Sequence, residues 1–349
     1  MAEERIELLS CALEGGCSAK IPPDLLEKTL SPLLQTKIDS NLLSDVDIGD
    51  DAGVYKMSED SALIYTVDFF PPVVADPYLF GQIAACNSIS DIYAMGAEPK
   101  LALNINMFPK DDSLNILAKI LQGGQDKATE AGVLVVGGHT IADASVKYGM
   151  SVIGFAHPKK ITKNSSAKDG DIIILTKPLG TGACLAGMRQ GVINEDSIND
   201  VYTSMITLNK IASNIMNKYN ITCATDITGF GLLGHAYKMA TASNVSIEIN
   251  AEALPMFEKT YEVLDMGCIP GASFTNMRYV GNNISIDSNL DYNLQMLSFD
   301  PQTSGGIFMC VKKDDVENIL ADLWREGIDY ASVIGKVYSK QDFYLYLNK

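Results

Sequence analysis

The chain has 349 residues, and at about 150 residues per domain this length predicts about two domains. Its 27 basic and 43 acidic side chains give a formal net charge of −16, which argues against binding to nucleic acid or to an anionic membrane surface, since both require many Lys and Arg. With 47% hydrophobic residues, a chain of this length can bury a large core, so disorder over most of it is excluded.

Residues 1–46 are predicted to form a mobile N-terminal segment ahead of the first domain. Residues 15–20 form a loop of small side chains, and Pro22-Pro23 then opens a short helix through Leu30, because proline is tolerated at a helix start. In the first half, hydrophobic periodicity predicts helices over 78–95 and 115–131 and strands over 62–67, 101–106, 133–136 and 148–156.

The second half repeats this mixture of strands and helices. A polar, lysine-containing segment, 157–170, is the expected linker between predicted domains 47–157 and 170–349. Beyond it we predict a strand over 172–176, a helix over 203–219, a helix after Phe230, strands over 245–249 and 306–311, a helix over 314–325 and two terminal strands. Two domains of α/β type follow.

Nothing in the sequence indicates secretion or membrane insertion. The charged N-terminus lacks the apolar stretch of a signal peptide, and no run approaches the ~18 apolar residues of a spanning helix. The seven cysteines are scattered without a C-x-x-C pair, which indicates reduced thiols rather than a disulfide framework. We therefore expect a cytoplasmic protein.

Several carboxylates stand where they could serve a metal. Asp45, Asp47, Asp50 and Asp51 crowd around Gly49 and form either a solvated acidic turn or a platform for Mg²⁺, which prefers carboxylate oxygens.

Two further carboxylates follow along the chain. Asp68 follows an apolar strand, where side chains commonly face a cleft. Asp91 and Asn87 share one face of a helix that carries few charges, so Asp91 is either a metal ligand or a capped structural carboxylate.

Two glycine-containing motifs could bind phosphate. Gly137-Gly138-His139-Thr140 follows the predicted strand 133–136 and forms either an anion-binding nest or an ordinary turn. Residues 229–234 fit the G-x-G-x-x-G pattern of a dinucleotide site, but Asp226 would repel a pyrophosphate unless a divalent cation lay between them. Metal-assisted phosphate chemistry is therefore favoured over a nicotinamide enzyme.

The N-terminal loop and a later loop could also take part. Lys20 lies three residues after Cys17, and a nearby ammonium would lower the pKa of the thiol and favour the nucleophilic thiolate; the alternative is an incidental cysteine in a tail. Residues 300–306 form a turn whose hydroxyls and glycines could equally line a phosphate pocket.

Together these segments resemble the selenophosphate synthetase (selenide, water dikinase) family, within the wider family that includes aminoimidazole ribonucleotide synthetase. The matching motifs are GCSAKI at 16–21, DDAGVY at 50–55, TVDFF at 66–70, SDIYAMG at 90–96, GGHT at 137–140, LTKPLG at 175–180, DITGFGLLGH at 226–235 and DPQTSGG at 300–306. The resemblance implies synthesis of selenophosphate, AMP and orthophosphate from ATP, selenide and water. It also implies two domains with mixed sheets, and a homodimer whose N-terminal domains share a sheet or barrel.

The resemblance also assigns roles to residues. Several Mg²⁺ ions would be held by Asp51, Asp91 and Asp226. The nucleotide would be contacted by Ile48, Gly49, Asp50, Asp68 and Asp91 and, from the partner chain, by Gly138, His139 and Thr140. Lys20 would approach the phosphates, and Cys17 would be the catalytic cysteine of the segment 1–46. A selenium-delivery protein is a further expected partner, and neither nucleic acid nor a membrane is.

Two departures from the family pattern and two rival functions complete this interpretation. Ala19 stands where relatives often carry a second cysteine, and Cys86 stands where the family helix often has threonine. Another enzyme of the superfamily, such as a thiamine-phosphate kinase, would lack Cys17 and Lys20, and a non-catalytic nucleotide-binding paralogue would have lost these residues or the carboxylates.

Overall fold

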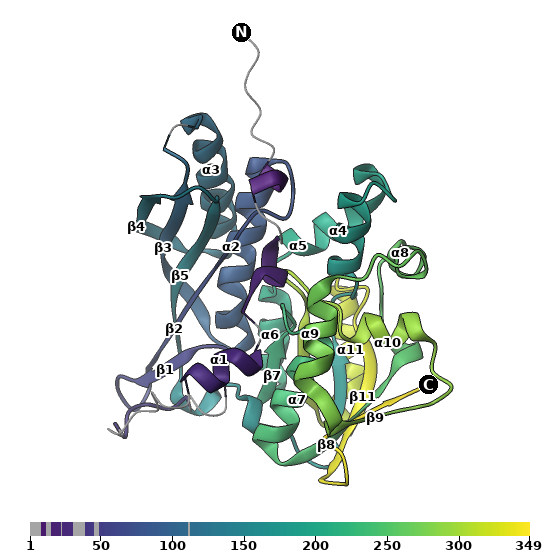
Figure 1. Cartoon of the computed structure of the whole chain (residues 1–349). Coiled ribbons are helices and arrows are strands. Elements are labelled where there is room, and N and C mark those ends of the chain that lie inside the picture. Colours follow the sequence, from purple (N-terminus) through teal and green to yellow (C-terminus); the bar gives the residue numbers. More distant parts are fainter. Residues whose placement is uncertain (1–7, 12–14, 22, 31–38, 45–48, 111) are drawn as a thin grey trace.

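The computed structural model describes residues 8–11, 15–21, 23–30, 39–44, 49–110 and 112–349 (Figure 1). Ahead of the first sheet lie two 3-10 helices, η1 (Leu8–Cys11) and η2 (Gly16–Ala19), and the helix α1 (Pro23–Leu30). Ile48, for which a nucleotide contact is expected, lies outside the described residues.

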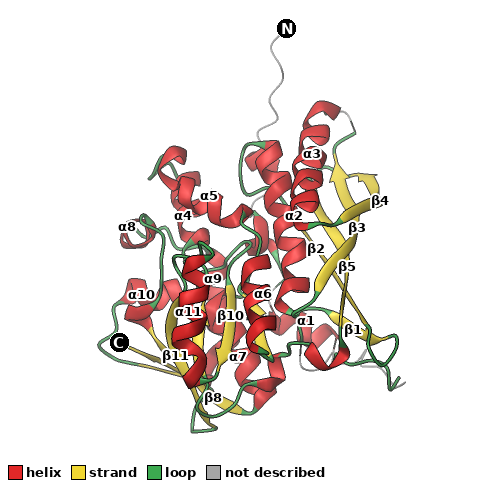
Figure 2. Ribbon diagram, turned by 180° about the vertical axis from the view of Figure 1, so that it is seen from behind, coloured by secondary structure: helices red, strands yellow, loops and turns green. Residues whose placement is uncertain are grey.

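The first domain is a five-stranded mixed sheet covered by two helices. The strand order is β1-β2-β5-β3-β4, and only β3 and β4 are parallel. The strands are β1 (Gly53–Lys56), β2 (Ala62–Phe70), β3 (Glu98–Phe108), β4 (Leu134–Ala142) and β5 (Lys147–Ala156). The helices α2 (Pro77–Ala94) and α3 (Leu114–Ala131) lie side by side on one side of the sheet (Figure 2).

Local sequence signals explain where these two helices begin and end. The Asp76 side chain caps α2 by accepting a hydrogen bond from the Leu79 amide at 2.7 Å, and Pro77 occupies the first helical position. Gly132 ends α3 in the left-handed conformation, with φ of 82°. Both helices therefore agree with the prediction within one residue at either end.

The face of the first sheet opposite α2 and α3 is apolar and exposed. Along β2, Ala62, Ile64 and Thr66 are buried under the helices, whereas the alternate residues Tyr65 and Val67 are 50% and 53% exposed. Exposed apolar side chains continue across the neighbouring strands at Leu103, Leu134, Val136, Ile141 and Phe155. This exposed sheet face is a contiguous apolar surface of the kind that marks an interaction site.

The second domain is a seven-stranded mixed sheet in the order β7-β10-β6-β11-β8-β12-β9. Its strands are β6 (Ile172–Leu175), β7 (Cys223–Asp226), β8 (Val245–Asn250), β9 (Ile284–Ile286), β10 (Ile307–Val311), β11 (Ser332–Ser339) and β12 (Leu345–Asn348). Its helices are α4 (Thr181–Arg189), α5 (Asn199–Ile206), α6 (Lys210–Tyr219), α7 (Gly231–Ser243), α8 (Thr260–Asp265), α9 (Gly271–Val280), α10 (Tyr292–Ser298) and α11 (Val316–Arg325).

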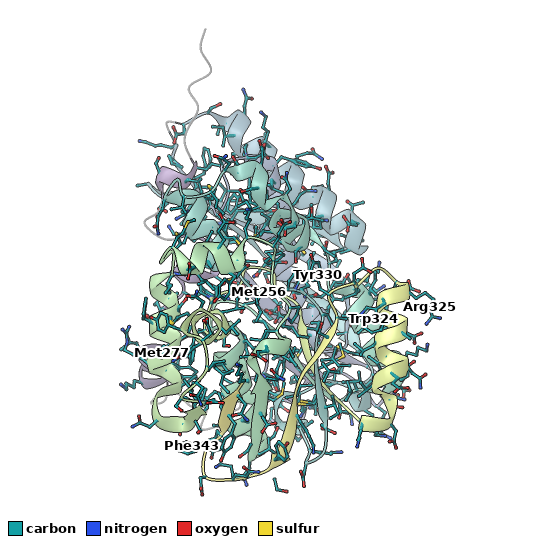
Figure 3. All side chains as sticks on the ribbon, turned by 90° about the vertical axis from the view of Figure 1, so that its right-hand side faces the viewer. Met256, Met277, Trp324, Arg325, Tyr330 and Phe343 are labelled. Carbon is teal, nitrogen blue, oxygen red and sulfur yellow. The ribbon has the colours of Figure 1, made fainter. Side chains whose placement is uncertain are left out.

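The second sheet is buried on both faces. Ile307 and Met309 of β10 pack into the apolar cluster beneath α6 and α11, and Phe308 and Cys310 pack into the main core on the side of α7. The helix α11 lies at the outer side of the domain, with Trp324 and Arg325 at its end (Figure 3). The mixed α/β architecture expected from the sequence is confirmed.

Two sequence predictions need correction. Gly137, Gly138, His139 and Thr140 do not follow a strand; they lie inside β4, where residues 138–140 pair with 104–106 of β3. The predicted helix 203–219 is two helices, α5 and α6, because buried Asn209 turns its amide toward Ser90 Oγ at 2.8 Å and Gly305 O at 2.9 Å.

The segment 157–170, the expected linker, connects the two sheets and is partly packed. It forms η4 (Pro158–Lys160) and η5 (Asn164–Ser166), and it buries Ile161, Thr162 and Asn164. Short 3-10 helices also join later elements: η6 (Glu195–Ile198), η7 (Ala251–Ala253), η8 (Gly281–Asn283) and η9 (Lys313–Asp315). Among the described helices, none has the length and hydrophobicity needed to cross a bilayer.

Candidate functional site

Three carboxylates from distant parts of the chain gather where the two domains meet. Asp91 comes from α2, Asp226 ends β7, and Asp51 precedes β1. Thr225 of β7 donates its hydroxyl to Asp51 Oδ1 at 2.7 Å, and Ser90, next to Asp91, hydrogen-bonds the carboxylate of Asp226. These contacts connect the acidic loop, the second sheet and α2 at one place.

The charges of this carboxylate group are poorly compensated. Burial raises the pKa of Asp51, Asp91 and Asp226, and the negative charge of Asp226 raises the pKa of the other two further. Asp51 Oδ2 and Asp226 Oδ2 are buried, and no described residue hydrogen-bonds either atom. A buried anion without a partner is costly, so this group is suited to bind cations.

The arrangement fits several ions shared with a ligand better than one ion enclosed by protein. Within the described part of the chain, no three His, Cys, Asp or Glu side chains already converge as ligands of a single metal. Mg²⁺ is usually held by one or two carboxylates, with water and substrate phosphates completing its octahedron. The dispersed donor set of Asp51, Asp91 and Asp226 fits that mode.

Hydroxyl groups and a histidine orient the carboxylates, and the sequence reasoning did not identify them. Thr66 Oγ1 donates to Asp91 Oδ2 at 2.5 Å, as Thr225 does to Asp51. The ring of His235 lies 3.4 Å from Thr225 Oγ1 and accepts from the Thr228 amide at 3.2 Å, and burial holds the pKa of His235 well below its usual value. Thr225 could have been suspected because it adjoins Asp226, and Thr66 and His235 because they belong to the motifs at 66–70 and 226–235.

Cys17 and Lys20 lie next to the same site, held by residues of α2 and β2. Lys20 Nζ donates to Asp68 Oδ2 at 3.0 Å, and Asn87 Nδ2 donates to the same oxygen at 2.6 Å. The Cys17 thiol lies 3.6 Å from Asn87 Oδ1. Asn87 therefore links Cys17 to the Asp68–Lys20 ion pair.

The expected low pKa of Cys17 is wrong for this arrangement. Burial, with the thiol 1% exposed, raises the pKa of Cys17 to about 12, and the opposing effect of the Lys20 ammonium is smaller. Although burial alone would lower the pKa of Lys20, the charge of Asp68 raises it overall, so the lysine stays charged. Cys17 is a thiol at neutral pH, and its proton must leave before the sulfur can act as a nucleophile.

Two glycines allow the cysteine segment to pack this closely. Gly16 has φ of 60°, and a Cβ there would lie 2.4 Å from a methyl of Val73 and 2.6 Å from Thr303 Oγ1. A Cβ on Gly229 would lie 2.5 Å from the carbonyl oxygen of Cys17. The space beside Gly229, the first glycine of the G-x-G-x-x-G pattern, is therefore occupied by Cys17 and is not available to a pyrophosphate.

The topology of the second sheet also excludes a dinucleotide site of the usual kind. Such a site needs a strand, a helix and a second strand that runs parallel to the first and lies close beside it in the sheet. Here β7 pairs antiparallel with β10, and the strand after α7, β8, lies four positions away in the sheet order. The nicotinamide alternative is therefore wrong.

The loop 300–306 supports the cysteine segment rather than offering its hydroxyls to a ligand. Thr303 Oγ1 accepts from the Cys17 amide at 3.4 Å, and the Ser304 amide donates to Asn87 Oδ1 at 2.9 Å. The buried carboxyl of Asp300 accepts from the Gly182 amide at 3.0 Å and from Gln302 Nε2 at 2.8 Å. Burial raises the pKa of Asp300 to about 8.

The remaining predicted nucleotide contacts are divided between two places. Asp50 Oδ1 accepts from the Asn164 amide at 3.0 Å, and Asn164 Nδ2 donates to Gly49 O at 3.1 Å, so Gly49 and Asp50 border the carboxylate group. Gly138, His139 and Thr140 lie on the exposed edge strand β4, three strand spacings or about 14 Å from β2 and Asp68. Within one chain the structure does not bring them to the site.

A cavity of about 240 Å³ opens beside the cysteine segment. It is lined by Cys17, Lys20, Ile21, Phe230, Thr275 and Asn276, among others. A small molecule in this cavity would lie against both the thiol and the ammonium.

Comparison with known proteins assigns both halves of the chain to families. Residues 49–156 match the family described as AIR synthase related protein, N-terminal domain, and residues 168–348 match its C-terminal domain. A selenide, water dikinase of Clostridioides difficile is 44% identical over 345 residues, which cover 99% of each chain. One of Treponema denticola is 47% identical over 323 residues, covering 93% of this chain and 91% of the relative.

Solved structures share the same fold at much lower identity. The hydrogenase maturation protein HypE in complex with ATP superposes with a TM-score of 0.57 at 19% identity, covering 92% of this chain and 88% of that chain. At this identity the likeness concerns the fold alone.

Proposed function

This chain belongs to the selenide, water dikinase family, and from that membership we propose that it makes selenophosphate from ATP, selenide and water and releases AMP and orthophosphate. The observation that carries the proposal is the nearly full-length match to selenide, water dikinases. The ion pair of Lys20 with Asp68 and the hydrogen bond of Thr225 to Asp51 support it, because they bring the cysteine segment and the carboxylates to neighbouring parts of the fold.

Asp51, Asp91 and Asp226 are the proposed Mg²⁺ ligands. The oxygens Asp51 Oδ2 and Asp226 Oδ2, which no described residue hydrogen-bonds, and the mutual repulsion of the three carboxylates favour cations. Bound Mg²⁺ would neutralise charge that spreads over the phosphates during transfer. Thr66, Thr225 and Ser90 hold the carboxylates in place through hydrogen bonds. The carboxylate group would thereby fix the triphosphate of ATP, with Gly49, Asp50 and Asp68 as further nucleotide contacts.

Lys20 and Cys17 are the proposed catalytic residues. The Lys20 ammonium, paired with Asp68 at 3.0 Å, is charged and would stabilise phosphate oxygens brought to the carboxylate group. The Cys17 thiol borders the same cavity and would receive the selenium substrate there. Since the thiol is protonated when buried, movement of the segment or arrival of substrate would precede any nucleophilic role.

A homodimer completes the proposal. The exposed sheet face carries Tyr65, Val67, Leu103 and Val136, each at least 45% exposed, and a second copy would cover it. Such a dimer would also give Gly138, His139 and Thr140 of β4 access to the partner's nucleotide, which they cannot reach within one chain. A selenium-delivery protein as an additional partner stays a prediction.

The test is a direct assay of the products. The purified protein is incubated anaerobically with ATP, Mg²⁺ and selenide, and ³¹P NMR follows a selenium-bound phosphorus while chromatography follows AMP. Equal amounts of selenophosphate, AMP and orthophosphate are expected. ADP as the sole nucleotide product, or ATP consumption that does not depend on selenide, would contradict the proposed function.

A further inference from the structure

A second cavity adjoins the one at Cys17. It has a volume of about 190 Å³ and is lined mainly by small and apolar residues, among them Val73, Leu185, Ala186, Pro270 and Thr303. Among the described residues that line it, Arg189, the last residue of α4, is the only charged one. Ser18, Gly271 and Ala272 line both cavities, so these three residues lie between the two cavities.

Arg189 has no carboxylate partner among the described residues. Its one hydrogen bond there runs from Nη2 to the Pro72 carbonyl oxygen at 3.0 Å, although a guanidinium offers five N–H donors. Burial lowers the pKa of Arg189, and no anion among the described residues opposes that effect. A half-buried guanidinium with donors that no described residue uses is suited to bind an anion.

The position of Arg189 connects this anion-binding capacity to Cys17. A Cβ on Gly15 would lie 2.3 Å from Arg189 Nη2, so the guanidinium lies directly against the backbone two residues before the cysteine. Lys20, the cation on the other side of the segment, already pairs with Asp68. Arg189 is thus the cation beside the cysteine segment whose charge no described carboxylate neutralises.

We propose that this second cavity takes up the selenium substrate as the hydrogen selenide anion, with Arg189 as its anchor, before the anion moves past Ser18 to Cys17. The inference rests on the proposed function and extends it to an entry site. Hydrogen selenide is a soft monoanion that is more weakly hydrated than phosphate. Apolar walls with one guanidinium therefore suit it, whereas a phosphate would leave several oxygens without donors.

Binding and turnover test the proposal separately. Anaerobic calorimetric titration of hydrogen selenide into the nucleotide-free protein is expected to show at least tenfold weaker binding to R189A than to the wild type, as the loss of a hydrogen bond from a charged donor predicts. R189K should recover part of the affinity. Equal affinities of wild type and R189A would overturn the proposal, whether or not the protein makes selenophosphate.

Steady-state kinetics distinguish a role of Arg189 in binding the selenium substrate from a purely structural role in holding the cysteine segment. In R189A the KM for selenide should rise about tenfold while kcat and the KM for ATP stay unchanged. Arg278, exposed on α9 and bonded only to Thr275 within the described chain, is the matched control, and R278A should leave all three constants unchanged. A rise in the KM for ATP equal to that for selenide would instead indicate a displaced cysteine segment and refute the anchor.

A variant that fills the cavity tests the proposal independently, in case R189A does not fold. Ala186→Leu adds bulk to the cavity wall and keeps the guanidinium. It should raise the KM for selenide without changing that for ATP. An unchanged KM for selenide in a folded Ala186→Leu variant would argue against entry through this cavity.

Discussion

Replacing Asp226 by asparagine should stabilise the ligand-free protein while abolishing its response to Mg·ATP. Asp226 is 1% exposed, its Oδ2 has no donor among the described residues, and the charges of Asp51 and Asp91 lie close by. Asparagine keeps the size of the side chain and removes the charge. The substitution therefore removes an unfavourable buried charge from the ligand-free fold and, at the same time, one proposed Mg²⁺ ligand.

The size of the effect follows from the burial of that charge. A buried, unsatisfied charged group costs roughly 2 kcal/mol, so the free energy of unfolding of the ligand-free variant should rise by about that amount. For a chain of this length the rise corresponds to an increase of about 3 °C in melting temperature. ATP with Mg²⁺ at a hundred times its Kd should stabilise the wild type by about 2.7 kcal/mol and the variant hardly at all.

The assay is thermal unfolding with EDTA and with Mg·ATP. Asp322→Asn is the matched control, because Asp322 is also buried, at 8% exposure, but pairs with Lys218 and Arg325. It belongs to α11, which lies at the outer side of the second domain (Figure 3). Asp322→Asn should lower the melting temperature in EDTA and keep the full Mg·ATP shift. A destabilised Asp226→Asn protein that still responds to Mg·ATP would refute the reasoning.

Three further predictions concern other parts of the molecule. Cys17→Ser should reduce selenophosphate formation at least a hundredfold in the NMR assay while the Mg·ATP melting shift persists, and wild-type turnover would count against a catalytic role. Folding raises the pKa of Asp300 to about 8, so between pH 5 and pH 8 the carboxyl is ionised in the unfolded chain but protonated in the folded one. Urea titrations should therefore show that the wild type loses about 1.4 kcal/mol of stability per pH unit relative to Asp300→Asn over this range. A difference that does not change with pH would contradict the assignment. Val136→Glu, at a position 61% exposed on β4, should leave the unfolding temperature of one chain unchanged but yield monomers in light scattering, and a persistent dimer would exclude this face.

Features with a local cause could be predicted from the sequence. The helix α2 begins at its Asp76 cap and α3 ends at Gly132, so both were placed within one residue. Asp51 was identified because several carboxylates crowd around Gly49, and Asp91 because its helix carries few charges. Asp226 was identified because its charge conflicts with the glycine pattern beside it. Such signals need no knowledge of tertiary contacts.

Features caused by distant contacts could not be predicted. The residues 137–140 extend β4 because β3 offers them a parallel partner, although their glycines suggest a turn. Burial raises the pKa of Cys17 and outweighs the nearby Lys20, and it depends on distant parts of the chain such as Gly229, more than 200 residues away in sequence. The hydroxyl of Thr66 reaches Asp91 only because β2 packs under α2.

Anomalous diffraction from crystals grown with Mn²⁺ and a non-hydrolysable ATP analogue would test the central claim most directly. Manganese, which accepts the same oxygen ligands as magnesium, should appear between the phosphates and the carboxylates of Asp51, Asp91 and Asp226. Manganese bound to the phosphates alone, with the three carboxylates in no contact with any ion, would contradict the account.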